Sequence, residues 1–339
     1  MLTGHGDDRY LFDGEIVADF SSNVIANHPL AIPKAVQAAC WDSIARYPAP
    51  NGEPLQAALA NFHDLAIDQV LVSNGATEAL YLLAKAFEKQ SATIFTPTFA
   101  EYQDACRIHH IKTSFLPWEA LSTVRDYGTA LIFICNPNNP TGQALSLETI
   151  RLILQKNPTA YLVIDEAYID FSDQCESVVP LLEQYSNLIL VKSLTKSFAI
   201  PGLRLGYILA AAKLIHKITN NKMPWSNNSI ALNVGLYLVK HYKQLLFDRT
   251  ALRQATEAFR MAVNAIDGVE ALPTSTNFFL IELKNKTSTE LKAFLLNQHG
   301  ILIRDAANFE GLDNRYCRLA CQSAEKNYLL IEALKAWMG

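Results

Sequence analysis

The first two-thirds of the chain alternates short apolar runs with amphipathic segments. Continuous apolar runs predict buried strands at 69–73, 92–95, 130–135, 160–165, 187–193 and 203–210. Apolar residues at helical spacing between them predict helices over 77–88, 99–108 and 146–156. Buried strands that alternate with helices are typical of a mostly parallel sheet covered on both faces. We therefore predict an α/β fold whose ligand site lies beyond the carboxyl ends of the strands.

The pattern changes near residue 211, where helical periodicity takes over and continues through 240–265. Four short strand-like runs then follow, GVEALP, NFFLIEL, ILIRD and RYCRLAC, with helices predicted near 288–298 and 323–337. This part reads as a smaller α+β domain. Residues 1–45 are too few to build a core of their own. We therefore expect a large domain over 46–225 and a small domain built from 1–45 and 226–339, with a cleft between them.

Composition and charge narrow the class of protein. Half of the 339 residues are apolar, 18% are charged and the formal net charge is -4, so nothing favours a nucleic acid or an anionic membrane as partner. The start, MLTGHGDDRY, lacks the apolar run of a signal peptide, and no run is long enough to span a bilayer. The six cysteines form no C-x-x-C pair. We expect a soluble cytoplasmic protein with reduced thiols and no metal site.

The segment SLTKSFAIPGLRLG (193–206) carries the strongest chemical signal. Lys196 follows a buried strand, where desolvation and a nearby cation would lower its pKa and let its amine form a Schiff base. Ser193 and Arg204 flank it and supply a hydroxyl and a guanidinium for a phosphate. The alternative is an ordinary lysine in a surface loop.

The strand end VIDEAYIDF (163–171) points to a cationic ring. Asp165 is costly to bury without a cationic partner, and a pyridinium nitrogen is such a partner. Tyr168 could donate to the phenolate oxygen of the same ring. The alternative for the Asp-Glu pair is a Mg²⁺ site, but the G-x-x-x-x-G-K-[ST] loop that accompanies such a site is absent from the sequence.

Two further strand ends add ligand groups. In CNPNNPTG (135–142) two prolines restrict the backbone, so that Asn139 could point its amide at the phenolate oxygen; a plain turn is the alternative. In VSNGATEALYLL (72–83) a strand leads into a helix whose first N–H groups, at Gly75, Ala76 and Thr77, suit a phosphate. Many α/β proteins share this second motif, and it gains weight from the other phosphate donors.

PTFAEY (97–102) places two aromatic residues at the start of a predicted helix. We choose Tyr102 over Phe99 to stack on a heterocycle, and the alternative is that both belong to the core. A lysine for a Schiff base, an aspartate for a pyridinium, an asparagine and a tyrosine for a phenolate, and several phosphate donors together describe one ligand. That ligand is pyridoxal 5′-phosphate (PLP).

The same motifs in the same order resemble the fold-type-I PLP enzymes of the aminotransferase class I/II family, over nearly the whole chain. The resemblance implies a PLP-dependent enzyme with a large sheet domain and a smaller domain. It also implies a homodimer, in which Tyr47, within RYPAPNG (46–52), reaches the cofactor phosphate of the neighbouring subunit. The alternative for Tyr47 is the end of a helix in a proline-rich turn.

Within the family, four stretches resemble the threonine-phosphate decarboxylases of cobalamin biosynthesis: GHGDD, DFSSN, PWSNN and 303–319. The resemblance implies a phosphorylated amino acid as substrate, with Arg318 on its carboxylate and His5, Asn23, Asn139 and Arg304 also holding it. A weak ion pair with Asp305 or Asp313 is the alternative for Arg304, and a disordered terminus is the alternative for His5.

The expected reaction is therefore decarboxylation of L-threonine O-3-phosphate to aminopropanol phosphate. The histidinol-phosphate aminotransferases share most of the motifs and stay the alternative. A PLP-binding regulator without catalysis is disfavoured because the sequence has no helix-turn-helix segment or basic extension. In two places the sequence departs from the decarboxylase pattern, since NVIANHPL replaces a glycine-containing turn and GHGDD replaces an HGGN-like start.

Overall fold

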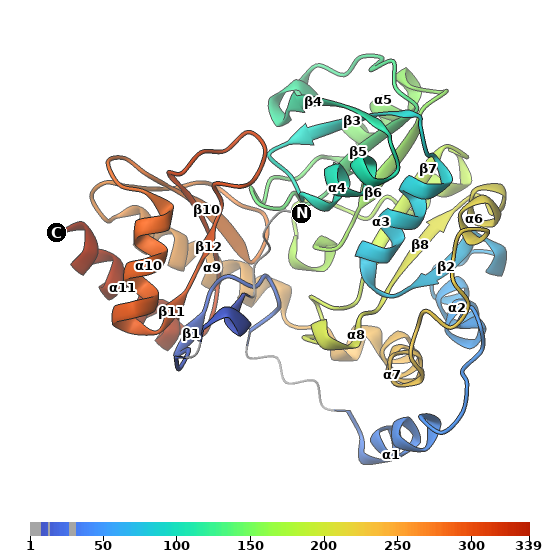
Figure 1. Ribbon diagram of the computed structural model, residues 1–339, viewed down its shortest axis with the longest axis horizontal. Helices are drawn as coiled ribbons and strands as arrows, with labels where there is room; N and C mark the ends of the chain where they lie inside the picture. Colours follow the sequence, from blue (N-terminus) through green and yellow to red (C-terminus); the bar gives the residue numbers. More distant parts are fainter. Residues whose placement is uncertain (1–7, 13, 27–31) are drawn as a thin grey trace.

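A seven-stranded sheet organises the larger part of the molecule (Figure 1). The computed structural model describes residues 8–12, 14–26 and 32–339. The strands lie in the order β2 (Val70–Ser73), β8 (Gly206–Ala210), β7 (Leu188–Ser193), β6 (Tyr161–Asp165), β5 (Leu131–Cys135), β3 (Ser91–Thr96) and β4 (Lys112–Pro117). The five strands from β7 to β4 are parallel, and β8 is antiparallel to both of its neighbours. The predicted α/β fold with a mostly parallel sheet is confirmed.

Helices cover both faces of this sheet, because the side chains of each buried strand alternate between two cores. On one face lie α3 (Gly75–Ala86), α4 (Glu101–Ile108) and α6 (Ala212–Thr219). On the other lie α2 (Glu53–Phe62), α5 (Leu147–Lys156) and α7 (Ser229–Lys240). Within β5, for example, Phe133 packs into the first core while Ile132 and Ile134 pack into the second.

The edge strand β4 was not predicted from the sequence. Its side chains are alternately exposed and half-buried rather than fully buried. An edge strand has a partner on one side only, and this one carries Lys112, Thr113 and Ser114 instead of an apolar run. The continuous apolar run that identified the other six strands, including β2 at the opposite edge, is therefore missing here.

The smaller domain is a four-stranded antiparallel sheet in the order β12 (Arg304–Asp305), β13 (Tyr316–Ala320), β10 (Phe278–Leu283) and β9 (Val269–Ala271). It packs with α9 (Arg249–Asn264), α10 (Ser288–His299) and α11 (Ala324–Met338) around its own core. The N-terminal β1 (Ala18–Asp19) pairs in parallel with β11 (Ile301–Leu302), so part of the N-terminal segment does join this domain. Figure 1 shows the domain, in orange and red, beside the large sheet.

The division of the chain at 225/226 remains a prediction. The buried residues of α7 belong to the core of the seven-stranded sheet, and α1 (Lys34–Ser43) packs against α7. This packing favours a boundary after the short α8 (Tyr242–Leu245), near the start of α9. Short 3-10 helices complete the fold: η1 (Arg9–Leu11), η2 (Ile67–Gln69), η3 (Trp118–Ser122), η4 (Ile169–Phe171), η5 (Val179–Glu183) and η6 (Pro201–Leu203).

Three further observations concern the described part of the chain as a whole. None of its helices combines the length and the apolar character needed to cross a bilayer. Its His, Cys, Asp and Glu side chains form no group of three or more that could hold a metal ion. All six cysteines are free thiols, and five of them are buried.

Candidate active site

Two adjoining pockets lie at the carboxyl ends of the parallel strands, beside the small domain. The inner pocket is lined by Ala76, Thr77, Phe99, Cys135, Asn139, Asp165, Ala167, Tyr168, Ser193, Thr195, Lys196 and Arg204. The outer pocket, of about 530 Å³, shares six of these residues and adds Ser21, Ser22, Asn23, Tyr81, Glu101, Ile108, Pro201 and Arg318. Lys196 lines both. Residues predicted from four separate motifs are thus brought to one place.

One end of the inner pocket is built to approach an anion closely. Gly75 begins α3 with φ +80, and a Cβ on it would lie 2.7 Å from Nη2 of Arg204. A Cβ on Gly206 would lie 2.6 Å from the backbone nitrogen of Ala76, so β8 and the start of α3 touch. The positive end of the helix and the Arg204 guanidinium therefore face the same space.

Two hydroxyls lie at the same end of the pocket. Ser193 ends β7, and its Oγ lies 2.8 Å from Oγ1 of Thr195, whose backbone N–H also donates to it. Hydroxyls, backbone N–H groups and a guanidinium together form a donor set that suits a phosphate. Thr195 was not singled out from the sequence, although its position between Ser193 and Lys196 in SLTK was the available signal.

Asp165 lies at the buried end of the inner pocket, as the last residue of β6. Its Oδ1 accepts from the backbone N–H of Ala167 at 3.0 Å, and its Oδ2 accepts from the hydroxyl of Tyr102 at 2.8 Å. Burial raises the pKa of this carboxyl to about 6, although both hydrogen bonds act in the opposite direction. A buried carboxylate of this kind is stabilised by a cationic ligand nitrogen.

Tyr102 does not line either pocket. It is fully buried beneath them, and its ring stacks on Phe133 with centroids 5.5 Å apart and an interplanar angle of 17°. Phe99 instead lines both pockets. The helix α4 begins at Glu101, two residues later than predicted, so Phe99 stays in the preceding loop. The geometry therefore differs from the sequence-based choice of Tyr102 as the stacking residue.

Polar side chains from four segments meet between the two pockets. The Asn23 side chain donates to the hydroxyl of Tyr168 at 3.3 Å, and Nη1 of Arg318 donates to Oδ1 of Asn139. Burial raises the pKa of Tyr168 to about 12, so its hydroxyl keeps its proton at neutral pH. Asn139 follows β5, Tyr168 follows β6, and Asn23 comes from the N-terminal segment. The cleft thus joins the large sheet to residues near both ends of the chain.

Two arginines stand directly opposite each other in the small domain. Arg304 in β12 and Arg318 in β13 are register partners in an antiparallel pair, so their side chains leave the same face. Both are buried, and burial lowers the pKa of each, that of Arg318 to about 10. Arg318 lines the outer pocket, and Arg304 lies beside it with its guanidinium 5.1 Å from the ring of Phe309. Like charges opposite one another favour an anion between or near them.

Asp305 and Asp313, the alternative ion-pair partners of Arg304, bond to other residues. Asp305 accepts hydrogen bonds from the hydroxyls of Ser288 and Thr289 at the start of α10. Asp313 pairs with Arg315 at 2.9 Å. Nη2 of Arg304 donates instead to Oδ1 of Asn308 at 2.7 Å. The two acidic neighbours therefore have partners of their own.

Comparison with known proteins identifies the family of the chain. The family model described as aminotransferase class I and II matches residues 15–334. The chain belongs to this family. The threonine-phosphate decarboxylase of Salmonella typhimurium and this chain are 32% identical over 332 residues. The match covers 94% of this chain and 90% of the Salmonella enzyme.

Solved structures of the same family are also similar. L-threonine-O-3-phosphate decarboxylase from Porphyromonas gingivalis matches with a TM-score of 0.90 and 33% identity, over 95% of this chain and 99% of that one. Histidinol-phosphate aminotransferase from Clostridium acetobutylicum matches with a TM-score of 0.85 and 28% identity, over 95% and 99%. Both relatives named in the sequence analysis are thus found among the similar proteins.

Two of the predicted site residues need separate mention. His5 lies outside the described residues. Tyr47 is 86% exposed, and its ring packs 5.3 Å from that of Trp225. It lines neither the inner nor the outer pocket of its own chain. A role of Tyr47 at a cofactor would therefore have to be played at the site of another subunit.

Proposed function

We propose that this protein binds PLP in the inner pocket and decarboxylates L-threonine O-3-phosphate to aminopropanol phosphate. The observation that supports this substrate is the buried pair Arg304 and Arg318, which are register partners, with Arg318 lining the outer pocket and Arg304 beside it. A phosphorylated amino acid has two anionic groups, a carboxylate and a phosphate, and arginine forks suit both. Family membership and the named relatives support the same reaction.

The inner pocket fits this cofactor on three grounds. Its phosphate end has no room for a Cβ at Gly75 and combines the start of α3, including Ala76 and Thr77, with Ser193 and Arg204. Its buried end holds a carboxylate, Asp165, whose pKa is raised and which a ring cation would stabilise. An amine, that of Lys196, lines the same pocket.

Other residues of the inner pocket would contact the PLP ring. When bound, PLP links through its aldehyde to an amine and draws electrons from a bond at that amine's α-carbon. Lys196 provides the amine that holds the cofactor, and Asp165 keeps the proton on the ring nitrogen. Tyr168 and Asn139 lie where they can donate to the phenolate oxygen, and Phe99 covers one face of the ring. Tyr102 acts from below, by donating to Asp165.

The outer pocket decides the reaction. Arg318 binds the carboxylate of the substrate, while Arg304 and His5 serve the phosphate and Asn23 helps to orient the substrate beside Tyr168. How the carboxylate is held decides whether carbon dioxide or the α-proton leaves, because the cofactor serves both outcomes. A histidinol-phosphate aminotransferase is the second candidate, since the inner pocket would serve it equally well and one such enzyme has a similar structure.

The test is a paired assay on the PLP-loaded protein. One tube contains L-threonine O-3-phosphate alone, and the other contains histidinol phosphate with 2-oxoglutarate. Carbon dioxide and aminopropanol phosphate from the first tube would support the decarboxylase. Glutamate from the second tube without carbon dioxide from the first would refute it and support the aminotransferase. Lys196→Ala is the control that should be inactive in both tubes.

We also propose a homodimer in which Tyr47 reaches the cofactor phosphate of the neighbouring subunit. The exposure of Tyr47 and its absence from the pockets of its own chain support this arrangement. A monomeric mass in solution, or unchanged PLP affinity in Tyr47→Phe, would contradict it. The proposed location is the cytoplasm, because buried free thiols suit a reducing compartment.

A further inference from the structure

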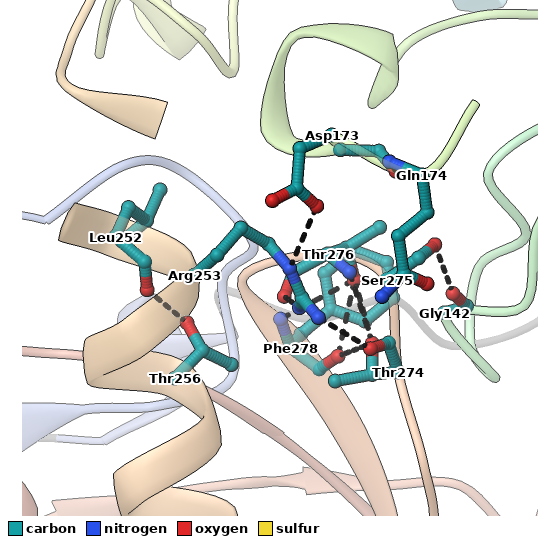
Figure 2. Close-up of polar contacts among 11 residues, drawn as sticks. Gly142, Asp173, Gln174, Leu252, Arg253, Thr256, Thr274, Ser275, Thr276 and Phe278 are labelled. Atoms are coloured by element: carbon teal, nitrogen blue, oxygen red, sulfur yellow. Dashed lines mark hydrogen bonds and ion pairs between the residues drawn. The ribbon is translucent and has the colours of Figure 1, made fainter. Parts of the chain in front are cut away.

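The segment 274–278, which leads into β10, lies where the small domain meets the loops of the large sheet (Figure 2). Its sequence is Thr-Ser-Thr-Asn-Phe. None of its residues was predicted as part of the site, and none lines the inner or outer pocket. The segment nevertheless contacts the loops or side chains of four residues to which we assign a role.

The closest of these contacts is to the loop that carries Asn139. The backbone N–H and the Oγ of Ser275 both donate to the carbonyl oxygen of Gly142, at 2.8 and 2.6 Å. The N–H of Gly142 in turn donates to the carbonyl of Asn138 at 2.7 Å. Gly142 has φ +72, and a Cβ there would lie 1.9 Å from Oγ1 of Thr274, so no other residue fits this contact. The Asn139 loop is therefore closed by a residue of the other domain.

The turn that presents Ser275 is itself held rigidly. The guanidinium of Arg253 in α9 donates to the carbonyls of Thr274 and Thr276, each at 2.8 Å, and its Nε lies 3.5 Å from Oδ1 of Asp173 (Figure 2). Asp173 belongs to the loop that follows η4. Since Arg253 is nine-tenths buried, this clamp fixes the turn relative to both domains.

The far end of the segment reaches the other site residues. The ring of Phe278 packs edge-on against Tyr168 with centroids 4.9 Å apart, and the guanidinium of Arg318 lies 5.6 Å from the same ring. The Asn277 side chain donates to the carbonyl of Asn23 at 3.4 Å. One short segment thus supports the loop of Asn139 at one end and Tyr168, Arg318 and Asn23 at the other.

We propose that Ser275 is a positioning residue for the reaction. By holding the Gly142 carbonyl, it fixes Asn139 against Tyr168 and Arg318, and it couples the docking of the small domain to the electrostatics of the cofactor site. This inference rests on the proposed function in one respect, namely that Asn139 donates to the phenolate oxygen of PLP. A role in domain stability alone is the competing explanation.

The test compares Ser275→Ala with a matched control in the full-length protein loaded with PLP. Thr256→Val removes an equally buried hydroxyl from α9, which donates to the carbonyl of Leu252 in the same helix at 2.8 Å (Figure 2). The primary readout is the pH midpoint of the visible absorption band of the bound cofactor, because stability alone does not move it. Thermal unfolding is measured alongside for both variants.

The expected shift has a sign. A donor to the phenolate oxygen stabilises the form that has lost the imine proton, so a weakened Asn139 contact raises the midpoint. Ser275→Ala should raise it by about 0.5 units or more, a threefold change in the proton affinity, while Thr256→Val leaves it unchanged. Asn139→Ala should give a larger shift in the same direction. In the Asn139→Ala background, Ser275→Ala should then add nothing, because both act through one contact.

Three outcomes would overturn the proposal. They are an unchanged midpoint in Ser275→Ala, an equal shift in Thr256→Val, and a Ser275→Ala shift that persists when Asn139 is already replaced. The titration uses no substrate, so it does not depend on whether the protein is a decarboxylase or an aminotransferase. If the wild-type protein formed no visible band with PLP, the cofactor assignment would fail as well, which separates the two kinds of failure.

Discussion

The hydroxyl of Tyr102 offers the sharpest test of the cofactor site, because it touches Asp165 and lies outside both pockets. Tyr102→Phe deletes one atom and leaves the ring stacked on Phe133. A hydrogen bond to a charged group contributes ~1.5–3 kcal/mol, which corresponds to ~1–2 pKa units. The pKa of Asp165, raised by burial to about 6 in the native protein, should therefore rise further, to ~7–8, in the variant.

The consequence is a pH-dependent loss of PLP affinity. At pH 7 the native Asp165 is ~90% ionised, whereas in Tyr102→Phe only ~10–50% of the molecules carry the charge that a pyridinium needs. Since apparent affinity scales with the competent fraction, PLP should bind ~2- to 10-fold more weakly at pH 7. The difference from the native protein should close by pH 9, where Asp165 is ionised in both.

The assay is a titration of the apoprotein with PLP at several pH values between 6 and 9, followed by absorbance or calorimetry. Tyr127→Phe is a suitable control, because it removes a tyrosine hydroxyl from a ring that packs edge-on against Phe95 and lines neither pocket. A loss of affinity in Tyr102→Phe that is as large at pH 9 as at pH 7 would refute the reasoning. It would mean that the hydroxyl acts through packing rather than through the charge of Asp165.

Three further predictions concern the same site. In the apoprotein, the pKa of Asp165 is raised from its ordinary value of 3.8 to about 6, so the folded state holds this proton more tightly than the unfolded state. The free energy of unfolding should therefore fall by up to ~3 kcal/mol as the pH rises from 4 to 6. Denaturant titrations of Asp165→Asn should lack this pH-dependent contribution. Gly75→Ala, with φ +80 and a Cβ 2.7 Å from Arg204, should lower stability by the ~1–2 kcal/mol of backbone strain and should also weaken PLP binding ~10-fold or more. Gly128→Ala, with φ +65 and open space around it, should show only the loss of stability, measured by thermal unfolding. Arg318→Lys keeps the charge but loses the fork, and should raise the KM for the phosphorylated substrate ~10-fold; because Nη1 of Arg318 also donates to Asn139, the pH midpoint of the cofactor band should rise as well, and an unchanged KM would contradict the assignment of this side chain to the substrate.

Much of this architecture follows from patterns that a sequence displays directly. The buried strands carry continuous apolar runs, and the residues that end or follow them, such as Asp165, Ser193 and Asn139, meet because parallel strands end at one edge of the sheet. The edge strand β4 escaped prediction because half-exposed strands lack that apolar signature.

The exchange of roles between Tyr102 and Phe99 could not be predicted in the same way. The choice between them depends on where α4 begins, and a shift of two residues turns a side chain by about half of a helical turn. The role of Ser275 was also hidden, because its contact with Gly142 joins residues 133 positions apart. Contacts of this kind depend on tertiary packing, which local periodicity in the sequence does not reveal.

The outer pocket adds residues from near both ends of the polypeptide to those that it shares with the inner pocket. Lys196, Asp165 and the phosphate donors of the inner pocket come from the middle of the chain, while Ser21, Asn23 and Arg318 of the outer pocket come from near its two ends. Changes that alter which molecule is accepted can therefore accumulate at the termini without disturbing the chemistry in the centre. The same arrangement suggests a practical route to new substrate specificities. Both terminal segments would be exchanged together, and the central sheet would be left unchanged.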